Sequence, residues 1–135
     1  MSKLYPRALV KYENAMNSYK KLGVDDAYVD DCCYNLQQTL ELLLKYMVEM
    51  RGNRYAENHD VRAQLNKLSS AGIALPCFDK IRNMASTINS WEAESRYLDS
   101  FVATIEDIDD VRNIVEELLE YCKDLAVEIN SEDAI

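Results

Sequence analysis

Residues 34–51 restrict the fold most, because they predict a long helix that is apolar on nearly every side. At 100° per residue, one side carries Leu36, Leu40, Leu43, Met47 and Met50. The other side carries a polar row at spacings of four, three and four residues, made of Tyr34, Gln38, Glu41 and Lys45. Such a helix is usually central in its domain or covered by a partner chain. We therefore expect another surface or a small molecule to cover the polar row.

The scarcity of helix-breaking residues indicates an all-helical chain. Only three Gly and two Pro occur among 135 residues, and 48% of the residues are apolar. This composition argues against a turn-rich β fold, and the length is that of one ordinary domain. We predict a single helical-bundle domain over residues 1–130 and a frayed C-terminal tail over residues 131–135.

Capping residues and apolar spacing divide this domain into five helices. Asp25 and Asp26 favour the start of the long helix, and Gly52 favours its end. We expect helices over about residues 6–21, 25–51, 59–69, 76–97 and 105–129. The predicted fold class is all-α: an antiparallel up-and-down bundle of four main helices plus a short additional helix.

The net charge of −9 is concentrated in the last third of the chain. Residues 91–135 carry fourteen acids and three bases, whereas residues 1–90 carry ten acids and twelve bases. This balance opposes non-specific binding of nucleic acid, so we expect no DNA partner. We interpret two clusters of basic residues as solvated surfaces rather than as local anion sites. The first comprises Lys3, Arg7, Lys11, Lys20 and Lys21, and the second comprises Arg51, Arg54 and Arg62.

Hydropathy and cysteine spacing bear on location and on cofactors. No run of 18 uncharged apolar residues and no secretion signal occurs, so we expect a cytoplasmic protein without a membrane partner. The four cysteines lack the spacing of metal ligands and suit small apolar side chains in a reducing compartment: Cys32, Cys33, Cys77 and Cys122. We expect no metal site and no cofactor.

Three short motifs follow one another in a recognisable order. Glu41 and Lys45 lie on the long helix that Gly52 ends, as in a Q-x-x-x-E-x-x-x-K-x-x-L-x-x-x-G pattern. His59-Asp60-Val61 corresponds to an H-D-L motif at the start of a short helix. Arg96-Tyr97-Leu98 corresponds to an R-Y-P motif in which Leu replaces the proline. Over about residues 6–126, this order resembles the HEPN domain (higher eukaryotes and prokaryotes nucleotide-binding), in particular bacterial HEPN proteins associated with minimal nucleotidyltransferases.

The resemblance implies a helical bundle that forms a homodimer and works with a minimal nucleotidyltransferase in a toxin–antitoxin or defence-type system. Many relatives are metal-independent ribonucleases that use an R-x(4-6)-H motif late in the bundle. Here Arg82-Asn83 looks like the start of that motif, but Thr87 occupies the place of the histidine. Thr does not shuttle protons near neutral pH. The late motif is therefore degenerate, and we lean against an enzyme.

A ribonuclease that uses Arg54 and His59 across a dimer is the alternative. His59 is the only histidine, and residues 54–59 satisfy R-x(4)-H. In this alternative RNA is the substrate, with His59 as base and Arg54 steadying phosphate charge. The competing interpretation of His59 is a residue that caps a helix or fixes a loop beside Asp60.

Our leading hypothesis is a binding module for a nucleotide or a partner protein. Glu41 and Lys45 could also form a simple helix ion pair, or set the register of a dimer seam. Arg96 and Tyr97 could fork a phosphate and stack on a base, or form a bend in which Tyr97 packs and Arg96 pairs with a nearby acid. A purely structural helical adaptor is the third possibility. The candidate ligand site comprises Gln38, Glu41, Lys45, His59, Arg96 and Tyr97.

Overall fold

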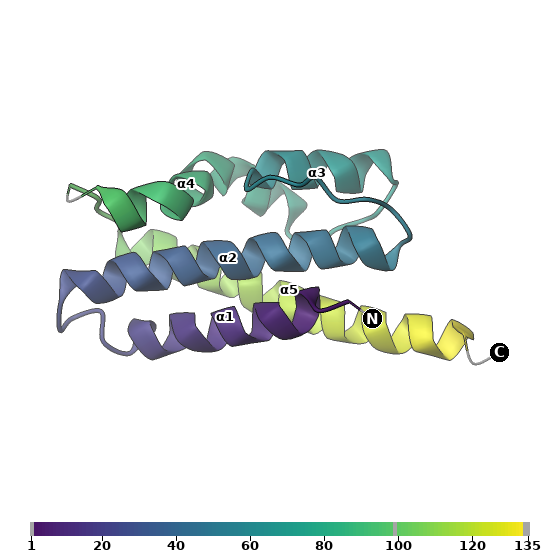
Figure 1. The fold of residues 1–135 in the computed structure, drawn as a ribbon, viewed down its shortest axis with the longest axis horizontal. Helices are drawn as coiled ribbons and strands as arrows, with labels where there is room; N and C mark the ends of the chain where they lie inside the picture. Colours follow the sequence, from purple (N-terminus) through teal and green to yellow (C-terminus); the bar gives the residue numbers. More distant parts are fainter. Residues whose placement is uncertain (1, 99, 134–135) are drawn as a thin grey trace.

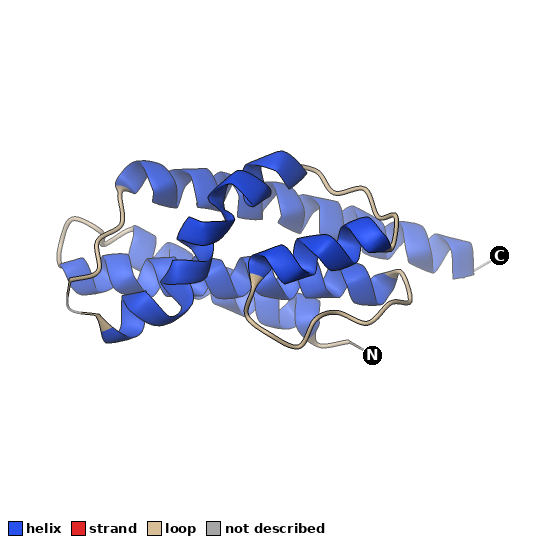
Figure 2. Cartoon of the chain, turned by 90° about the horizontal axis from the view of Figure 1, so that it is seen from above, coloured by secondary structure: helices blue, strands red, loops and turns tan. Residues whose placement is uncertain are grey.

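The computed structural model describes residues 2–98 and 100–133, and every regular element in them is a helix (Figure 2). In chain order these are α1 (Leu4–Tyr19), α2 (Asp26–Met50), α3 (Val61–Ser70), α4 (Phe78–Tyr97) and α5 (Ile105–Asp133) (Figure 1). The all-α class is thus confirmed, with four long helices and one short helix. None of the described helices is long and apolar enough to cross a membrane.

Side-chain caps define several helix starts where the sequence predicted them. The Asp25 carboxylate accepts a hydrogen bond from the Ala27 N–H at 2.8 Å, and Asp60 accepts one from the Arg62 N–H at 2.9 Å. Thr104 Oγ1 accepts from the Asp107 N–H at 3.1 Å at the start of α5. Each cap satisfies an amide that has no partner within the first turn of its helix.

The helices predicted over residues 6–21 and 76–97 would each begin at a proline, but both begin at other residues in the structure. Helix α1 begins at Leu4, so Pro6 lies inside its first turn, where the missing N–H costs nothing. Helix α4 begins at Phe78, after Pro76, and Cys77 precedes it with φ of +56°. At the other end of the chain, α5 continues to Asp133, three residues beyond the predicted domain end at residue 130. Residues 134–135 of the predicted tail lie outside the described residues.

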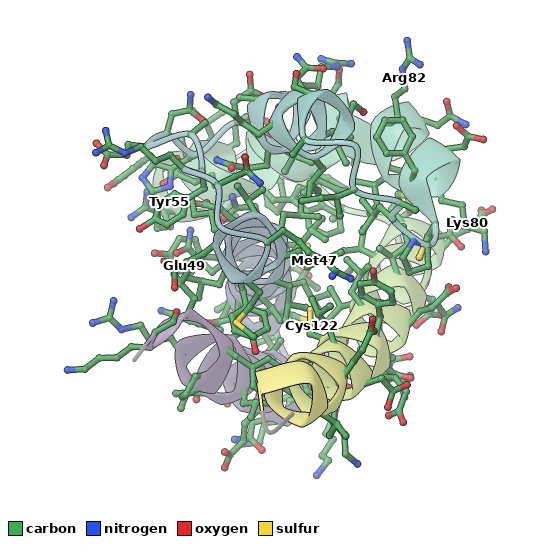
Figure 3. The ribbon with its side chains drawn as sticks, turned by 90° about the vertical axis from the view of Figure 1, so that its right-hand side faces the viewer. Met47, Glu49, Tyr55, Lys80, Arg82 and Cys122 are labelled. Atoms are coloured by element: carbon green, nitrogen blue, oxygen red, sulfur yellow. The ribbon has the colours of Figure 1, made fainter. Side chains whose placement is uncertain are left out.

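Helix α2 is central, because α1, α3, α4 and α5 all pack against it. In Figure 1, α1 lies along one side of α2, α3 and α4 lie along the other, and α5 lies behind. Helices α1, α2, α4 and α5 alternate in direction, which gives the antiparallel bundle. Figure 3 looks along the bundle and shows Met47 and Cys122 pointing between the helices. Full burial of each core Leu or Met contributes about 1.5–3 kcal/mol, and α2 supplies Leu36, Leu40, Leu43, Leu44 and Met47.

Helices α1 and α5 are joined by polar contacts between long side chains. The Tyr12 hydroxyl donates to the Glu116 carboxylate at 2.8 Å, and the Tyr19 hydroxyl donates to the Asp109 carboxylate at 2.5 Å. The Arg112 guanidinium lies 4.6 Å from the centre of the Tyr19 ring and donates to Glu116 at 2.9 Å. The first and last helices are thereby tied together across 90 or more residues of sequence.

Candidate functional site

A buried carboxylate organises the polar row of α2. The Glu41 side chain is 4% exposed. Its oxygens accept hydrogen bonds from Gln37 Nε2 at 2.9 Å and from Lys45 Nζ at 2.8 Å, and His59 Nδ1 lies 2.9 Å from Oε1. Gln38 Nε2 in turn donates to Gln37 Oε1 at 2.7 Å. We refer to these five side chains as the Glu41 network.

The three donors compensate for the burial of the Glu41 carboxylate. A buried charge is costly unless hydrogen bonds and an opposite charge satisfy it. The Lys45 ammonium supplies that charge from the next turn of α2, and its side chain is only 12% exposed. The Glu41–Lys45 pair is therefore a covered contact, in contrast to the solvated helix pairs that contribute a few tenths of a kcal/mol.

The cover over the polar row comes from the same chain. After α2 ends, the segment 51–60 runs back along α2 before α3 begins (Figures 1 and 2). This path brings His59 onto Glu41 and places the Tyr55 ring 5.4 Å from Lys45 Nζ. Figure 3 shows Tyr55 on the outer side of α2, away from the core side of Met47.

Hydrogen bonds from α3 and α4 hold this segment in place. Gln64 Nε2 of α3 donates to the Ala56 carbonyl at 2.7 Å. Asn89 of α4 accepts from the Val61 N–H and donates to the Asp60 carboxylate, each at 2.9 Å. Asp60 is thus both the cap of α3 and a link to α4. His59 is positioned by a loop that is fixed on both sides.

His59 presents one ring nitrogen to the network and the other to the outside. A proton on Nδ1 satisfies the Glu41 carboxylate, which leaves Nε2 for contacts beyond the network. The His59 side chain is 61% exposed, whereas the carboxylate that orients it is buried. A buried acid that orients an exposed imidazole is an arrangement that acid–base chemistry can use.

Arg96 and Tyr97 lie apart from the Glu41 network, at the N-terminal part of the same polar row. The Arg96 guanidinium lies 4.7 Å from the centre of the Tyr34 ring, and Lys11 Nζ lies 5.6 Å from the same ring centre. Arg96 also pairs with Glu92 at 2.7 Å, as the bend interpretation predicted. The expectation that Tyr97 packs in such a bend is wrong, because Tyr97 is 72% exposed.

A groove lies between α1 and α2, beside the polar row. It has a volume of about 450 Å³ and is lined by Lys3, Pro6, Arg7, Val10, Lys11, Gln38 and Leu42. Its three cations are spaced four residues apart along α1, about 6 Å per step. Gln38 belongs to both this α1–α2 groove and the Glu41 network.

The structure separates the two residues of the alternative ribonuclease motif. Arg54 is exposed and lines a different hollow with Glu49, Tyr55 and Lys67, whereas Nδ1 of His59 faces Glu41. Within the described residues of this chain, no recorded interaction joins Arg54 to His59. In the late motif, Arg82 points outward from α4 (Figure 3).

The cysteines offer neither a nucleophile nor a metal centre. Burial raises the pKa of Cys32 and of Cys122 to about 12, and burial together with Glu117 raises the pKa of Cys77 to about 12. Burial and nearby charge also raise the pKa of Cys33. Thiols of this kind are protonated at neutral pH. Across residues 2–98 and 100–133, no cluster of three or more His, Cys, Asp or Glu side chains could hold a metal ion.

Sequence reasoning missed Gln37 and Tyr55, and it favoured a solvated surface for the cations of α1. The spacing of four residues between Gln37 and Glu41 was an available signal, as was the repeat of cations at positions 3, 7 and 11. No comparable signal existed for Tyr55, because its contact with Lys45 depends on the path of the loop.

Comparison with known proteins identifies a protein family. The family model described as HEPN domain matches residues 1–125, which covers all of α1 to α4 and most of α5. No curated protein and no solved structure matches the chain significantly.

Proposed function

We propose that this chain, which belongs to the HEPN domain family, binds a nucleotide in the α1–α2 groove beside the Glu41 network. At the level of the family, membership supports a nucleotide-binding or ribonuclease-type module. The observation that carries the proposal is the lining of the groove. In a chain of net charge −9, the charged side chains of this groove are all cations.

The groove combines the two kinds of surface that a nucleotide needs. Lys3, Arg7 and Lys11 form a row that suits consecutive phosphate groups, with Arg7 able to fork two phosphate oxygens. The apolar wall of Val10 and Leu42 suits the face of a base.

Gln38 supplies a polar contact whose direction is set by the network. One N–H of its amide is committed to Gln37, and Gln37 is in turn held by Glu41. The remaining N–H and the carbonyl oxygen of Gln38 then serve as a donor and an acceptor for a sugar or a base edge. In this proposal Glu41, Lys45 and His59 position Gln38, while Arg96 and Tyr97 extend the site past Tyr34.

Nucleotide-induced thermal stabilisation tests the proposal. ATP and AMP should raise the melting temperature, adenosine should do so less, and high salt should weaken the effect because the phosphate contacts are ionic. The double variant Arg7→Ala/Lys11→Ala should lose most of the shift. The control variant Lys80→Ala/Lys123→Ala removes the same amount of charge from exposed positions elsewhere, and it should retain the nucleotide-induced shift in melting temperature. If all these nucleotides leave the melting temperature unchanged, the proposal is wrong.

A second candidate function is RNA cleavage with His59 as general base, possible in a homodimer where Arg54 of one protomer meets His59 of the other. The orientation of His59 by the buried Glu41 favours it, because an oriented imidazole with an available Nε2 is what a general base requires. Structured and single-stranded RNA should then be cut by the native protein but not by His59→Ala or Arg54→Ala. If the native protein leaves RNA intact, the ribonuclease function is wrong and the binding function is unaffected.

We also propose that the module acts in the cytoplasm as a homodimer, with a minimal nucleotidyltransferase as partner in a toxin–antitoxin or defence-type system. The motif resemblance to HEPN proteins associated with minimal nucleotidyltransferases motivates this proposal, and four free cysteines suit a reducing compartment. Light scattering should give twice the mass of one chain, and a co-expressed nucleotidyltransferase from the neighbouring reading frame should co-purify. A monomer that retains neither ligand nor partner would instead support a structural adaptor.

A further inference from the structure

Exposed apolar side chains collect in the two connections at one end of the bundle. Eight large apolar side chains are exposed among the described residues, and five of them lie in or next to these connections: Val24, Tyr97, Leu98, Val102 and Ile105. Val102 is 84% exposed and Val24 is 73% exposed. The α1–α2 connection and the α4–α5 connection both lie at the left-hand end in Figures 1 and 2. We call these five side chains the apolar end.

The α4–α5 connection presents its apolar side chains on an anchored backbone. Phe101 and Ala103 pack against the core, whereas Val102 between them and Leu98 before them are exposed. The Phe101 N–H donates to the Leu98 carbonyl at 3.1 Å. A patch of apolar side chains held outward in this way is typical of a protein-binding surface.

Acidic side chains surround the apolar end. Glu94, Glu106 and Asp107 flank the α4–α5 connection, and Asp25, Asp26 and Asp30 follow Val24. Arg96, Lys20 and Lys21 lie at the same end. Arg96 pairs with Glu92, and Lys21, 5.3 Å from the centre of the Tyr28 ring, keeps its charge, so among the described residues two unpaired positive charges stand against the six acids. The surroundings of the patch are therefore net negative.

We infer that the apolar end is a docking surface for a basic amphipathic segment of a partner protein. Burial of Leu98, Val102 and Ile105 provides the apolar contact, and the surrounding acids attract Lys and Arg on the polar face of such a segment. A second copy of this chain docked end to end would bring two acidic rings together, which disfavours self-association at this surface. The surface lies at the opposite end of α1 from Lys3 and Arg7 and shares only Tyr97 with the proposed nucleotide site, so the Leu98 and Val102 contacts are tested separately from nucleotide binding.

A labelled peptide tests the inference directly. The probe is a helical peptide of Leu and Lys residues with one apolar face, and its control carries Glu in place of Lys. Fluorescence anisotropy should show binding of the Lys peptide that weakens with salt, and no binding of the Glu peptide. Absence of binding by the Lys peptide at low salt overturns the inference.

Matched variants locate the site of binding. Leu98→Ser/Val102→Ser should weaken binding roughly tenfold or more, as expected for truncation of central apolar contacts. Leu9→Ser/Val127→Ser removes comparable exposed side chains from the middle of α1 and the C-terminal half of α5, and should bind like the native protein. Circular dichroism and melting temperature establish that each variant is folded. Equal binding by both double variants, or a dimer of the native protein that Leu98→Ser/Val102→Ser dissociates, overturns the inference.

Discussion

Glu41 is the residue on which the geometry of the candidate site depends most. Its carboxylate accepts hydrogen bonds from Gln37 one turn before it, from Lys45 one turn after it and from His59 in a loop 18 positions away. Because the carboxylate is almost fully covered, it has little access to water as a replacement for a lost donor. The Glu41–Lys45 pair should therefore behave as a buried ion pair even though its spacing is that of an ordinary surface pair.

A double-mutant cycle on this pair measures that difference. Glu41→Leu should lower the free energy of unfolding by about 3 kcal/mol, since it leaves the Lys45 ammonium covered and unpaired. The double variant Glu41→Leu/Lys45→Met should be more stable than the sum of its single variants predicts, with a coupling of about 1–3 kcal/mol. Urea unfolding provides the measurement. The same cycle on the more exposed pair Glu92 and Arg96 should give a coupling of only about 0.3–0.5 kcal/mol, and equal couplings would contradict the prediction.

Single residues were predictable where helical spacing alone placed them. Gln38, Glu41 and Lys45 follow from the period of α2, and His59 followed from the resemblance to a family motif. Gln37 was missed because it lies 100° from Gln38, on a side of the helix that the sequence shows as mainly apolar. Its spacing of four residues from Glu41 permits the contact, but spacing alone does not fix the rotamer that makes it.

At the scale of elements, the returning segment 51–60 is the least regular part of the site and the part that covers it. Two side chains of the segment contact α2: His59 contacts Glu41, and Tyr55 contacts Lys45. Gln64 of α3 donates a hydrogen bond to the Ala56 carbonyl of the segment. His59→Ala removes the first contact without altering the caps of α3. The segment should then open locally while the bundle remains folded.

Hydrogen exchange detects this local opening. Amides of residues 51–60 should exchange roughly tenfold faster in His59→Ala, as expected for a loss of about 1.4 kcal/mol of local stability. Amides in the middle of α2 should keep their native rates. Asn53→Ala is the control, because it removes a side-chain amide that donates to the Arg51 carbonyl within the turn. Uniformly faster exchange in all helices would contradict a local role for His59.

The start of α4 contains the only positive φ outside glycine among the described residues. Cys77 has φ of +56° and ψ of +21°, a region that costs a residue with a Cβ about 1–2 kcal/mol. Cys77→Gly should therefore be more stable than Cys77→Ala by about 1 kcal/mol in denaturant unfolding, since both lose the thiol and only Gly relieves the backbone. Greater stability of Cys77→Ala would contradict the assignment of φ.

Helix boundaries were predictable where a side chain acts on its own backbone. Asp25, Asp60 and Thr104 cap the helices that follow them, and Gly52 ends α2 with φ of +77°. The start of α1 was placed less well, because a proline such as Pro6 fits any position of the first turn. The path of segment 51–60 was not predictable, since it depends on contacts with three helices.

For the whole molecule, the acidic character of α5 affects how the bundle closes. The carboxylates of Asp109 and Glu116 accept from the hydroxyls of Tyr19 and Tyr12, so neutral phenols join the first helix to the last. Burial and the bond to Glu116 raise the pKa of Tyr12. The bond to Asp109, followed by burial, raises the pKa of Tyr19. Closure of the bundle is therefore coupled to the protonation of these two phenols.

The stability of the bundle should accordingly fall in alkali. In the unfolded chain the phenols ionise near pH 10, whereas in the folded chain they keep their protons to higher pH, so unfolding releases protons in this window. The stabilisation is complete below pH 10 and is lost as the pH rises from there through the folded pKa values. Urea midpoints between pH 8 and pH 11 should show this decline, and Tyr12→Phe/Tyr19→Phe should make it shallower while lowering stability at pH 8. The remaining decline belongs to the buried thiols of Cys32 and Cys122, because burial raises the pKa of each to about 12. Tyr97→Phe, which alters an exposed tyrosine at the end of α4, should follow the native curve. A decline that persists unchanged in the double variant would assign alkaline unfolding to other groups and separate it from the contacts between α1 and α5.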